Sequence, residues 1–560
     1  IGRLHKILKG ERSKNLSLKN KNSYIKVMEN KNTYSELLYK SNPFNYTIPA
    51  LLEAHGRLYG LTPKDSRKAR VLELGSSFGG NIITQALYNP EAEFIGIDLT
   101  SEQVKKGNEI IEKIGLKNIK LIEKNILDIN KDLGEFDYII VHGVFSWVPK
   151  DVQDKIVKIC NENLTEEGIG YISYNTYPGW KEPDKIREMM IYANKYFPEI
   201  SLGDKNQRGK AFISIVAEQM KLYDDISKKK GDFIKQIEEV VGMQDYYVAH
   251  EYLESFNHPL YLNEFVDLMK KENLEYISDV ALRLSIISTY NKNTVEKLQQ
   301  LSQGDHVIKE QCLDYILDTK FRRSIICKNS QAKKLNFSES FPNEILDSFL
   351  LSLRYTKEEL ETLNEDNVKT IMLHLVETPN KSFVIKDAMK YWESTAKDKN
   401  DEKRNEVISN LRKFVLNSMI NGKIKFYCSE NEVVPYEENK VYIPEKFRNY
   451  LKTLIIGEGA GVVGIANSRN ELINDLNDVD VIVADILSEP KTEKEIIEKL
   501  SKMTVWLCNQ ALDEYDFKEG ESYVVICRSD SVPYQSVSVF LTITEQGRFF
   551  KWWAFVEKEQ

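Results

Sequence analysis

A short glycine-rich stretch, VLELGSSFGGNI at residues 71–82, has the composition of a ligand-binding turn. An apolar run leads directly into Gly75, Gly79 and Gly80. Glycines at such positions let the backbone approach a ligand closely and let the following helix pack tightly on a sheet. The stretch therefore predicts a buried parallel strand, a turn that holds a small molecule, and a helix that starts near Asn81.

Asp98 supplies a second group that could bind a ligand. It lies in the next apolar run, 93–100, twenty-three residues after Gly75. An acid at this spacing can accept hydrogen bonds from both hydroxyls of a ribose. We expect Asn125 and Ile126, after the third strand, to lie beside the base of the same ligand. The residues expected to bind the cofactor are Glu73, Gly75, Ser76, Ser77, Gly79, Asn81, Asp98, Leu99, Asn125, Ile126, His142 and Gly143.

Strand-like and helix-like segments alternate in the part of the chain that would position these groups. Strands are expected at 70–75, 93–100, 119–126, 136–144 and 168–175, with helices at 81–88, 102–114 and 151–163. Five strands in this rhythm predict a parallel, doubly wound α/β sheet. Ligands of such sheets bind outside the carboxyl ends of the strands, where the glycine turn and Asp98 are expected.

Two nucleoside cofactors compete for this site. A nicotinamide dinucleotide requires GxGxxG, whose second glycine makes room for the pyrophosphate, and this chain has a serine at that position of GSSFGG. S-adenosylmethionine carries no phosphate, and its enzymes commonly show ExGxxxG, which Glu73, Gly75 and Gly79 match. The pattern favours S-adenosylmethionine. A third interpretation, in which the glycines serve packing alone, leaves the position of Asp98 unexplained.

With these motifs the sequence resembles bacterial class I methyltransferases that carry a regulatory domain, in particular the rickettsial protein lysine methyltransferases that act on outer membrane protein B. The stretches that carry the resemblance are NPFNYTIPALLEAHGRLYGL (42–61), VLELGSSFGGN (71–81), HGVFSWVP (142–149), YNTYPGW (174–180), HEYLESFNHPLYLNEF (250–265) and EQCLDYILDTKFRRSIIC (310–327). Relatives often have GCGxGGN in the turn where this chain has GSSFGGN (75–81), and the bulky Phe78 changes the contact expected at its position.

The resemblance implies a Rossmann-like sheet of seven strands, with the sixth at 273–280 and an antiparallel seventh at 321–328. It also implies an S-adenosylmethionine-dependent enzyme that methylates lysine side chains of a large outer-membrane or surface protein. Methyl transfer mainly requires that donor and amine be held in line, and an aromatic slot both disfavours the charged ammonium and binds it by cation–π contact. The expected catalytic residues are His142, Phe145, Trp147, Tyr174, Asn175 and Tyr177.

Several of these assignments have alternatives. An aromatic residue in a strand-end loop, including Trp180, often belongs to the core instead, and His142 could be a core histidine with satisfied hydrogen bonds. Residues 34–60 are expected to form a helical lid, with Tyr46 and His55 near the pocket. A different class of function also stays open: a methyltransferase of small molecules or nucleic acid with a regulatory module in its C-terminal half.

The length of 560 residues predicts three or four domains. We expect an N-terminal extension (1–40), a catalytic domain (41–330) with helical insertions at about 190–245 and 283–318, a winged-helix-like domain (331–460) and an α+β domain (461–560). The catalytic domain needs only strands up to Lys328, which predicts that a chain ending near Asn329 folds alone. The remainder, 331–560, would then recognise the protein substrate.

Composition limits the other partners. A net charge of −8 argues against a nucleic-acid surface over the whole chain, and no apolar run is long enough to span a membrane. The six cysteines are scattered, without a CxxC pair, so neither a metal site nor a disulfide framework is expected. We expect a cytoplasmic protein, and amphipathic spacing in 201–248 is compatible with either a homodimer or ordinary packing.

Overall fold

The computed structural model describes residues 41–197, 204–377, 382–430, 440–455 and 463–499, the last with gaps at 474–475, 477, 493 and 497, and the strands 522–528 and 536–542. All of these residues belong to one unit of the chain, Lys40–Gln560. No helix among the described residues is both long and apolar enough to cross a membrane.

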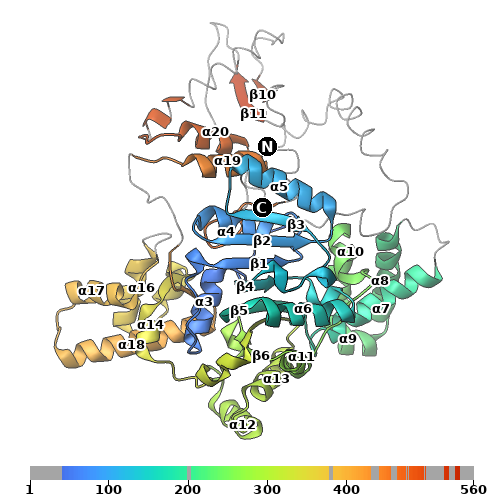
Figure 1. Ribbon diagram of the computed structural model, residues 1–560, viewed down its shortest axis with the longest axis horizontal. Helices are drawn as coiled ribbons and strands as arrows, with labels where there is room; N and C mark the ends of the chain where they lie inside the picture. Colours follow the sequence, from blue (N-terminus) through green and yellow to red (C-terminus); the bar gives the residue numbers. More distant parts are fainter. Residues whose placement is uncertain are drawn as a thin grey trace. The chain divides into compact units, whose positions relative to one another are not determined.

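A seven-stranded sheet lies at the centre of the described residues (Figure 1). Its order is β3-β2-β1-β4-β5-β7-β6, and its first five strands run parallel while β7 runs antiparallel to both β5 and β6. This order confirms the seven-stranded methyltransferase sheet expected from the sequence. The strands are β1 (Arg70–Leu74), β2 (Glu93–Asp98), β3 (Ile119–Glu123), β4 (Phe136–Val141), β5 (Leu164–Asn175), β6 (Leu274–Asp279) and β7 (Phe321–Lys328).

Helices connect and cover the sheet because their apolar faces must be buried against it. On one face the core joins Leu72 and Ile139 of the central strands to Ile156 of α6 and Phe265 of α11. These side chains are almost fully buried, so this face forms a continuous hydrophobic core. The helices that pack around the sheet are α3 (Pro49–Leu58), α4 (Gly80–Tyr88), α5 (Ser101–Ile114), α6 (Lys150–Asn163) and α11 (Leu262–Lys271).

Two groups of helices are inserted around β6, in agreement with the helical character expected there. The first comprises α7 (Lys181–Tyr196), α8 (Lys205–Leu222), α9 (Asp224–Gly242) and α10 (Asp245–Tyr252), which lie together in Figure 1. It has a small core of its own, in which Met190, Ile213 and Ile237 are fully buried. The second group is α12 (Lys292–Ser302) and α13 (His306–Leu317), between β6 and β7.

The residues after 330 form shorter elements. Strands β8 (Leu350–Leu353) and β9 (Ile424–Tyr427) pair antiparallel, and so do β10 (Ser522–Arg528) and β11 (Ser536–Thr542). The helices are α14 (Asn343–Ser348), α15 (Lys357–Glu361), α16 (Asp366–Val376), α17 (Ile385–Thr395), α18 (Asp401–Ile420), α19 (Glu445–Ile455) and α20 (Asp478–Ile486). The stretch 440–444 makes one isolated bridge, between Val441 and Lys491. Residues 1–40 and the aromatic tail at 548–556 lie outside the described residues.

The C-terminal half covers helix α4 of the catalytic part. The hydroxyls of Thr84 and Tyr450 lie 2.9 Å apart, and the rings of Tyr88 and Phe447 have centroids 4.9 Å apart. A chain ending near Asn329 would therefore expose an apolar surface of α4 and lose these contacts. The structure gives no support to the expectation that the catalytic part is independent of the C-terminal half.

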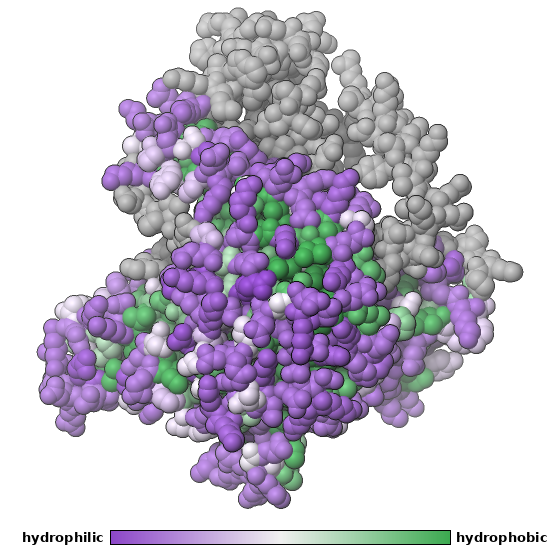
Figure 2. All heavy atoms as spheres, in the orientation of Figure 1, coloured by the Kyte–Doolittle hydropathy of each residue, from purple (hydrophilic) through white to green (hydrophobic). Residues whose placement is uncertain are grey.

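Apolar and polar residues are unevenly distributed over the face seen in Figure 2. Hydrophilic residues cover most of it, and hydrophobic residues gather over the central sheet. Because the core residues of the sheet are almost fully buried, the hydrophobic residues seen here form an exposed apolar area over the sheet.

Candidate active site

The glycine turn after β1 has the conformation that its sequence predicts. Gly75 and Gly79 have φ angles of +75° and +80°, in the left-handed region that favours glycine. A Cβ atom on Gly75 would lie 2.4 Å from a methyl group of Val144, so no larger residue fits there. The backbone N–H groups of Gly75 and Ser76 both donate to the carbonyl of Ile97, at 2.8 and 3.0 Å. The turn is thereby fixed against the end of β2.

Asp98 at the end of β2 faces this turn. One carboxylate oxygen accepts from the backbone N–H of Ser77 at 2.8 Å, and the other accepts from that of Thr100 at 2.9 Å. Each oxygen can accept a further hydrogen bond, because a carboxylate offers about four lone-pair sites. The carboxylate is held in one orientation and could bind the hydroxyls of a ribose.

An apolar surface adjoins Asp98 at the end of β3. The side chain of Leu99 is 65% exposed and that of Leu127 is 41% exposed, which is unusual for leucines beside a core. Asn125 accepts the backbone N–H of Leu127 at 3.0 Å and so fixes the loop, while Ile126 is half-buried. A flat base bound next to a ribose on Asp98 would cover these apolar groups.

The end of β4 leaves space for a ligand. Gly143 has φ +68°, and a Cβ atom built on it would meet nothing within 4 Å. Its N–H donates to the hydroxyl of Ser173 at 2.9 Å. Beside it, Nδ1 of His142 lies 3.0 Å from the hydroxyl of Tyr171. Burial, followed by the nearby charge of Arg323, lowers the pKa of His142 to about 3, so this ring is neutral at physiological pH.

Glu73 and Asn81 form a buried polar link behind the turn. Nδ2 of Asn81 donates to Glu73 at 2.7 Å, and Oδ1 of Asn81 accepts from the N–H of Phe44 at 2.9 Å. The second carboxylate oxygen of Glu73 is buried without a partner among the described residues. Burial raises the pKa of Glu73 to about 8, and so the carboxyl is largely protonated near neutral pH. Asn81 therefore positions the turn, with its side chain already engaged.

The aromatic residues expected in the acceptor slot divide into two sets. Phe145 and Tyr174 are buried in the hydrophobic core, where both rings pack on Phe265. Their side chains do not reach the strand-end surface, so we leave them out of the proposed slot. Aromatic rings near strand ends can pack in the core or line a pocket, and here both rings pack against α11 through Phe265.

Trp147 follows β4, and Tyr177 and Trp180 follow β5, where Trp180 is itself only 9% exposed. The rings of Trp147 and Trp180 meet edge to face, with centroids 6.4 Å apart. Tyr177 faces Tyr261, a residue that the sequence reasoning did not single out, at 5.4 Å. The hydroxyl of Tyr177 donates to Asp184 at 2.6 Å, which orients the ring.

The segment 257–260 crosses the same strand ends. Asn175 donates its side-chain amide to Asn257 at 3.0 Å, and the N–H of Tyr177 donates to the carbonyl of Leu260 at 3.1 Å. Ser146 accepts the N–H of Asn175 through its hydroxyl at 2.9 Å. Asn175 thus joins two loops beside the proposed slot.

The N-terminal segment brings Tyr46, which was expected, and Phe44, which was not expected, to the strand ends. The ring of Phe44 lies 4.1 Å from that of His142, so the segment 41–47 does reach the strand ends. Tyr46 is half-buried nearby. His55, by contrast, is fully buried on α3 against Phe426 of β9, at 4.9 Å, and lies in a packing contact instead of the pocket.

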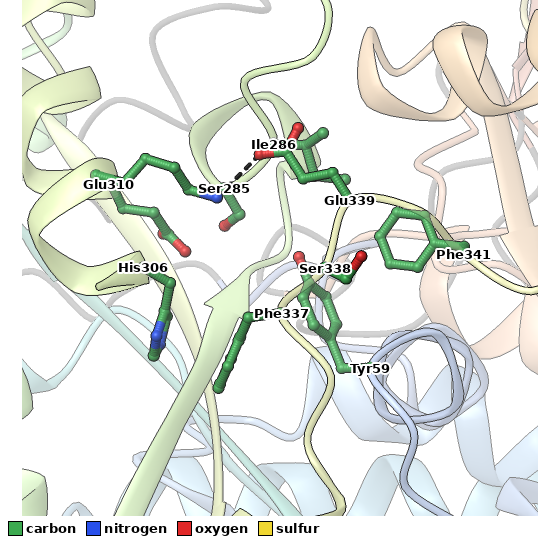
Figure 3. A pocket seen from close by; sticks show the side chains of 10 residues that line it. Tyr59, Ser285, Ile286, His306, Glu310, Phe337, Ser338, Glu339 and Phe341 are labelled. Carbon is green, nitrogen blue, oxygen red and sulfur yellow. Dashed lines mark hydrogen bonds and ion pairs between the residues drawn. The ribbon is translucent and has the colours of Figure 1, made fainter. Parts of the chain in front are cut away.

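A separate small pocket lies beside α13 (Figure 3). Its lining includes His306, Glu310 and Phe337, and the rings of Phe337 and His306 stack with their centroids 3.6 Å apart. None of the residues expected to bind cofactor lines it. Among the described residues, no group of three or more metal-ligating side chains comes together.

The residues at the strand ends fit an adenosyl cofactor. Asp98 is oriented toward the turn, exposed apolar groups lie next to it, and Gly143 borders open space. Comparisons with known proteins agree with this geometry. Residues 65–189 match the model of a methyltransferase domain, and residues 244–328 match that of a predicted methyltransferase regulatory domain. The chain is a class I methyltransferase, and its cofactor is S-adenosylmethionine.

Two Rickettsia prowazekii proteins place the chain in a family. Protein RP789 is 32% identical over 409 residues, covering 68% of this chain and 72% of the relative, and protein RP028 is 34% identical over 235 residues, covering 42% and 92%. The chain belongs to the family of these two proteins. Together with the match to a methyltransferase domain model, these relatives confirm the resemblance to rickettsial methyltransferases.

A solved structure shares the fold over most of the chain. PKMT2 from Rickettsia typhi in complex with AdoHcy is 23% identical with a TM-score of 0.71, covering 86% of this chain and 94% of the other. A winged helix domain model matches residues 433–532, later than the expected range 331–460. The C-terminal region thus contains a winged helix domain, and the boundaries given from the sequence remain a prediction.

Proposed function

We propose that this chain transfers methyl groups to lysine side-chain amines of a large outer-membrane or surface protein. The proposal is supported by the resemblance to rickettsial protein lysine methyltransferases and by the likeness to PKMT2 over most of both chains. An acceptor of this kind has to present a long, positively charged side chain at the ends of β4 and β5.

The observation that carries the proposal is an ammonium group already held on the aromatic loop. Nζ of Lys181 lies 3.7 Å from the ring centroid of Tyr177 and 5.8 Å from that of Tyr261. Two aromatic faces attract a cation through their quadrupoles, and they accept a methylated ammonium as well. The chain's own lysine indicates which type of group this surface binds.

The residues of the chain would act mainly by positioning. On the donor side, Asp98, the glycine turn and Gly143 would hold the cofactor, which supplies the methyl group. On the acceptor side, Trp147, Tyr177 and Trp180, together with Tyr261, would orient the lysine and exclude water. A lysine has a reference pKa of about 10.4, so partial desolvation on this surface favours the neutral amine that attacks.

The proposal also assigns a role to the regulatory segment at residues 244–328. Asn257 and Leu260 bond to the backbone or side chains at the end of β5 and just after it, so this segment would shape the acceptor side. Residues 331–560 would supply the wider docking area, because a specific protein contact usually buries more than about 1,000 Å².

Methyl-labelled S-adenosylmethionine offered with three separate acceptor fractions tests this function. The fractions are cell-envelope protein, nucleic acid and small metabolites. We expect label in protein that survives acid hydrolysis as methyl-lysine. Label confined to nucleic acid or metabolites would favour the alternative function instead.

A further inference from the structure

Two cations from distant parts of the chain meet at one aromatic ring. The guanidinium carbon of Arg323, on β7, lies 4.1 Å from the ring centroid of Tyr46, and Nζ of Lys425, on β9, lies 5.5 Å from it. All three side chains are partly buried and partly exposed. A ligand could therefore reach them without unfolding of the chain.

The charges of these two cations are incompletely balanced. The neighbouring Arg322 is fully buried and bonds to Asp314 at 2.8 Å and Glu310 at 3.2 Å. Nε of Arg323, by contrast, is buried with no hydrogen-bond partner among the described residues. No carboxylate of the described residues lies within ion-pair distance of Lys425. Such groups usually find a partner when they are buried.

The acidic groups nearby are already engaged. Against the effect of burial, the charge of Asp279 raises the pKa of Arg323. Both oxygens of Asp279, however, accept backbone N–H groups, those of Ala281 and Arg323, each at 2.7 Å, and neither forms an ion pair with the guanidinium. Glu471 forms an ion pair with Arg354. Burial, followed by the charges of Arg323 and Arg354, lowers the pKa of Lys425, and the charge of Glu471 opposes this shift.

The cluster adjoins the acceptor side of the strand ends. Arg323 pairs with Ser173 in the register of β5 and β7, and the hydroxyl of Ser173 lies 3.2 Å from Nδ1 of His142. Phe44, two residues before Tyr46, packs on the same histidine. Asp98 and the turn that would hold the cofactor belong to β1 and β2, on the other side of β4.

We propose that Arg323 and Lys425, placed on the ring of Tyr46, bind a carboxylate of the acceptor protein, namely an acidic side chain close in sequence to the methylated lysine. This inference rests on the proposed function and specifies its substrate. A planar guanidinium and an ammonium are the groups that recognise carboxylates best. The site would select among lysines by the charge beside them.

Heptapeptides with one central lysine test the inference. A single glutamate is scanned from three residues before the lysine to three residues after it, and a second set carries glutamine instead. We expect at least one glutamate peptide to be methylated about tenfold more efficiently, in kcat/KM, than its glutamine partner. Equal rates across both sets would overturn the inference while leaving lysine methylation intact. No methylation of any peptide, or of the envelope fraction, would instead contradict the proposed function.

Variants then assign the preference to the two cations. Arg323→Gln and Lys425→Gln should each remove most of the preference for glutamate, and Arg323→Lys should restore part of it. Lys425→Glu should shift the preference to peptides with arginine beside the acceptor. Lys423→Gln is the matched control, because Lys423 lies two residues away and already pairs with Glu359. A preference that survives both glutamine variants would place the carboxylate elsewhere.

A second experiment tests whether the two cations bind a carboxylate of the acceptor protein or the carboxylate of the cofactor. S-adenosylhomocysteine carries an amino-acid carboxylate, whereas methylthioadenosine has none, so calorimetry with both reports on the donor. We expect Arg323→Gln and Lys425→Gln to leave both affinities unchanged. A loss confined to S-adenosylhomocysteine would assign the cations to the cofactor and overturn the inference. Thermal unfolding of each variant checks that it is folded.

Discussion

Asn470 donates its side-chain amide to the backbone carbonyl of Asn81 at 2.8 Å and to the side-chain oxygen of the same residue at 3.1 Å. Asn81 in turn donates to Glu73 at the end of β1, at 2.7 Å. A buried chain of hydrogen bonds thus connects the C-terminal half to the glycine turn. Asn470 is 1% exposed, so water cannot replace these bonds.

Substitution Asn470→Asp should destabilise the protein and weaken cofactor binding. The change removes the donor and places a carboxylate against two acceptor oxygens, which should lower the free energy of unfolding by about 1–3 kcal/mol. Chemical denaturation and calorimetry with S-adenosylhomocysteine measure the two effects. Asn293→Asp on the exposed surface of α12 is the control, with both quantities expected near wild type. A wild-type denaturation curve for Asn470→Asp would contradict the link.

Substitution Asp98→Ala should abolish measurable cofactor binding and leave the fold intact. Loss of charge-assisted hydrogen bonds to two ribose hydroxyls corresponds to about 2–4 kcal/mol. Calorimetry with S-adenosylmethionine gives the affinity, and thermal unfolding gives the stability. Glu123→Ala, at the exposed end of β3 opposite Asp98 in the register, serves as the matched control. Wild-type affinity in Asp98→Ala would contradict the assignment of Asp98 to the ribose hydroxyls.

Substitution Tyr177→Ala should reduce methyl transfer about tenfold or more while the cofactor affinity stays within about threefold, because the lost ring belongs to the acceptor side. Tyr177→Phe keeps the ring and loses only the hydrogen bond to Asp184, so it should retain most of the activity. Phe145→Ala should instead cost about 3–5 kcal/mol of stability, since its ring lies in the core. Unchanged turnover in Tyr177→Ala would remove this residue from the slot.

Glu73 should make the stability depend on pH. Its pKa is raised from 4.5 to about 8 in the folded protein, so the folded state holds a proton that the unfolded state releases above pH 4.5. The stability due to this proton is therefore complete below pH 4.5 and falls as the pH rises toward 8, by at most about 1.4 kcal/mol per pH unit. Glu73→Gln has no carboxyl group at this position, so its free energy of unfolding lacks this dependence on pH.

The measurement is the difference in free energy of unfolding between wild type and Glu73→Gln at several pH values. Other titrating groups cancel in this difference. We expect the stability of wild type to fall steadily relative to that of the variant from pH 5 to pH 8. A difference that does not change with pH would show that Glu73 titrates normally.

The catalytic fold could be predicted from the sequence because its signals are local. The strand before Gly75, the spacing to Asp98 and the alternation of strands and helices depend only on neighbouring residues. The residues that were missed act over long separations: Asn470 meets Asn81, and Tyr261 faces Tyr177. No periodicity in the sequence marks such contacts.

The burial of individual aromatic residues could not be predicted from the sequence either. Phe145 and Trp147 are two residues apart in one loop, yet Phe145 is fully buried and Trp147 is partly exposed. The short helix over Phe145–Trp147 turns the two rings in different directions. Side-chain type alone could not separate a core ring from a slot ring, because the separation depends on how α11 packs against the sheet.

Mass spectrometry of the acceptor protein tests the central claim most directly. Purified outer-membrane protein is incubated with S-adenosylmethionine and either the wild-type chain or Asp98→Ala, then digested and sequenced by fragmentation. We predict that lysine side chains gain the mass of one or more methyl groups after treatment with the wild-type chain and gain none after treatment with Asp98→Ala. Methyl groups found only on residues other than lysine would contradict the central claim. So would an unmodified outer-membrane protein, if the same enzyme binds the cofactor and methylates another class of acceptor.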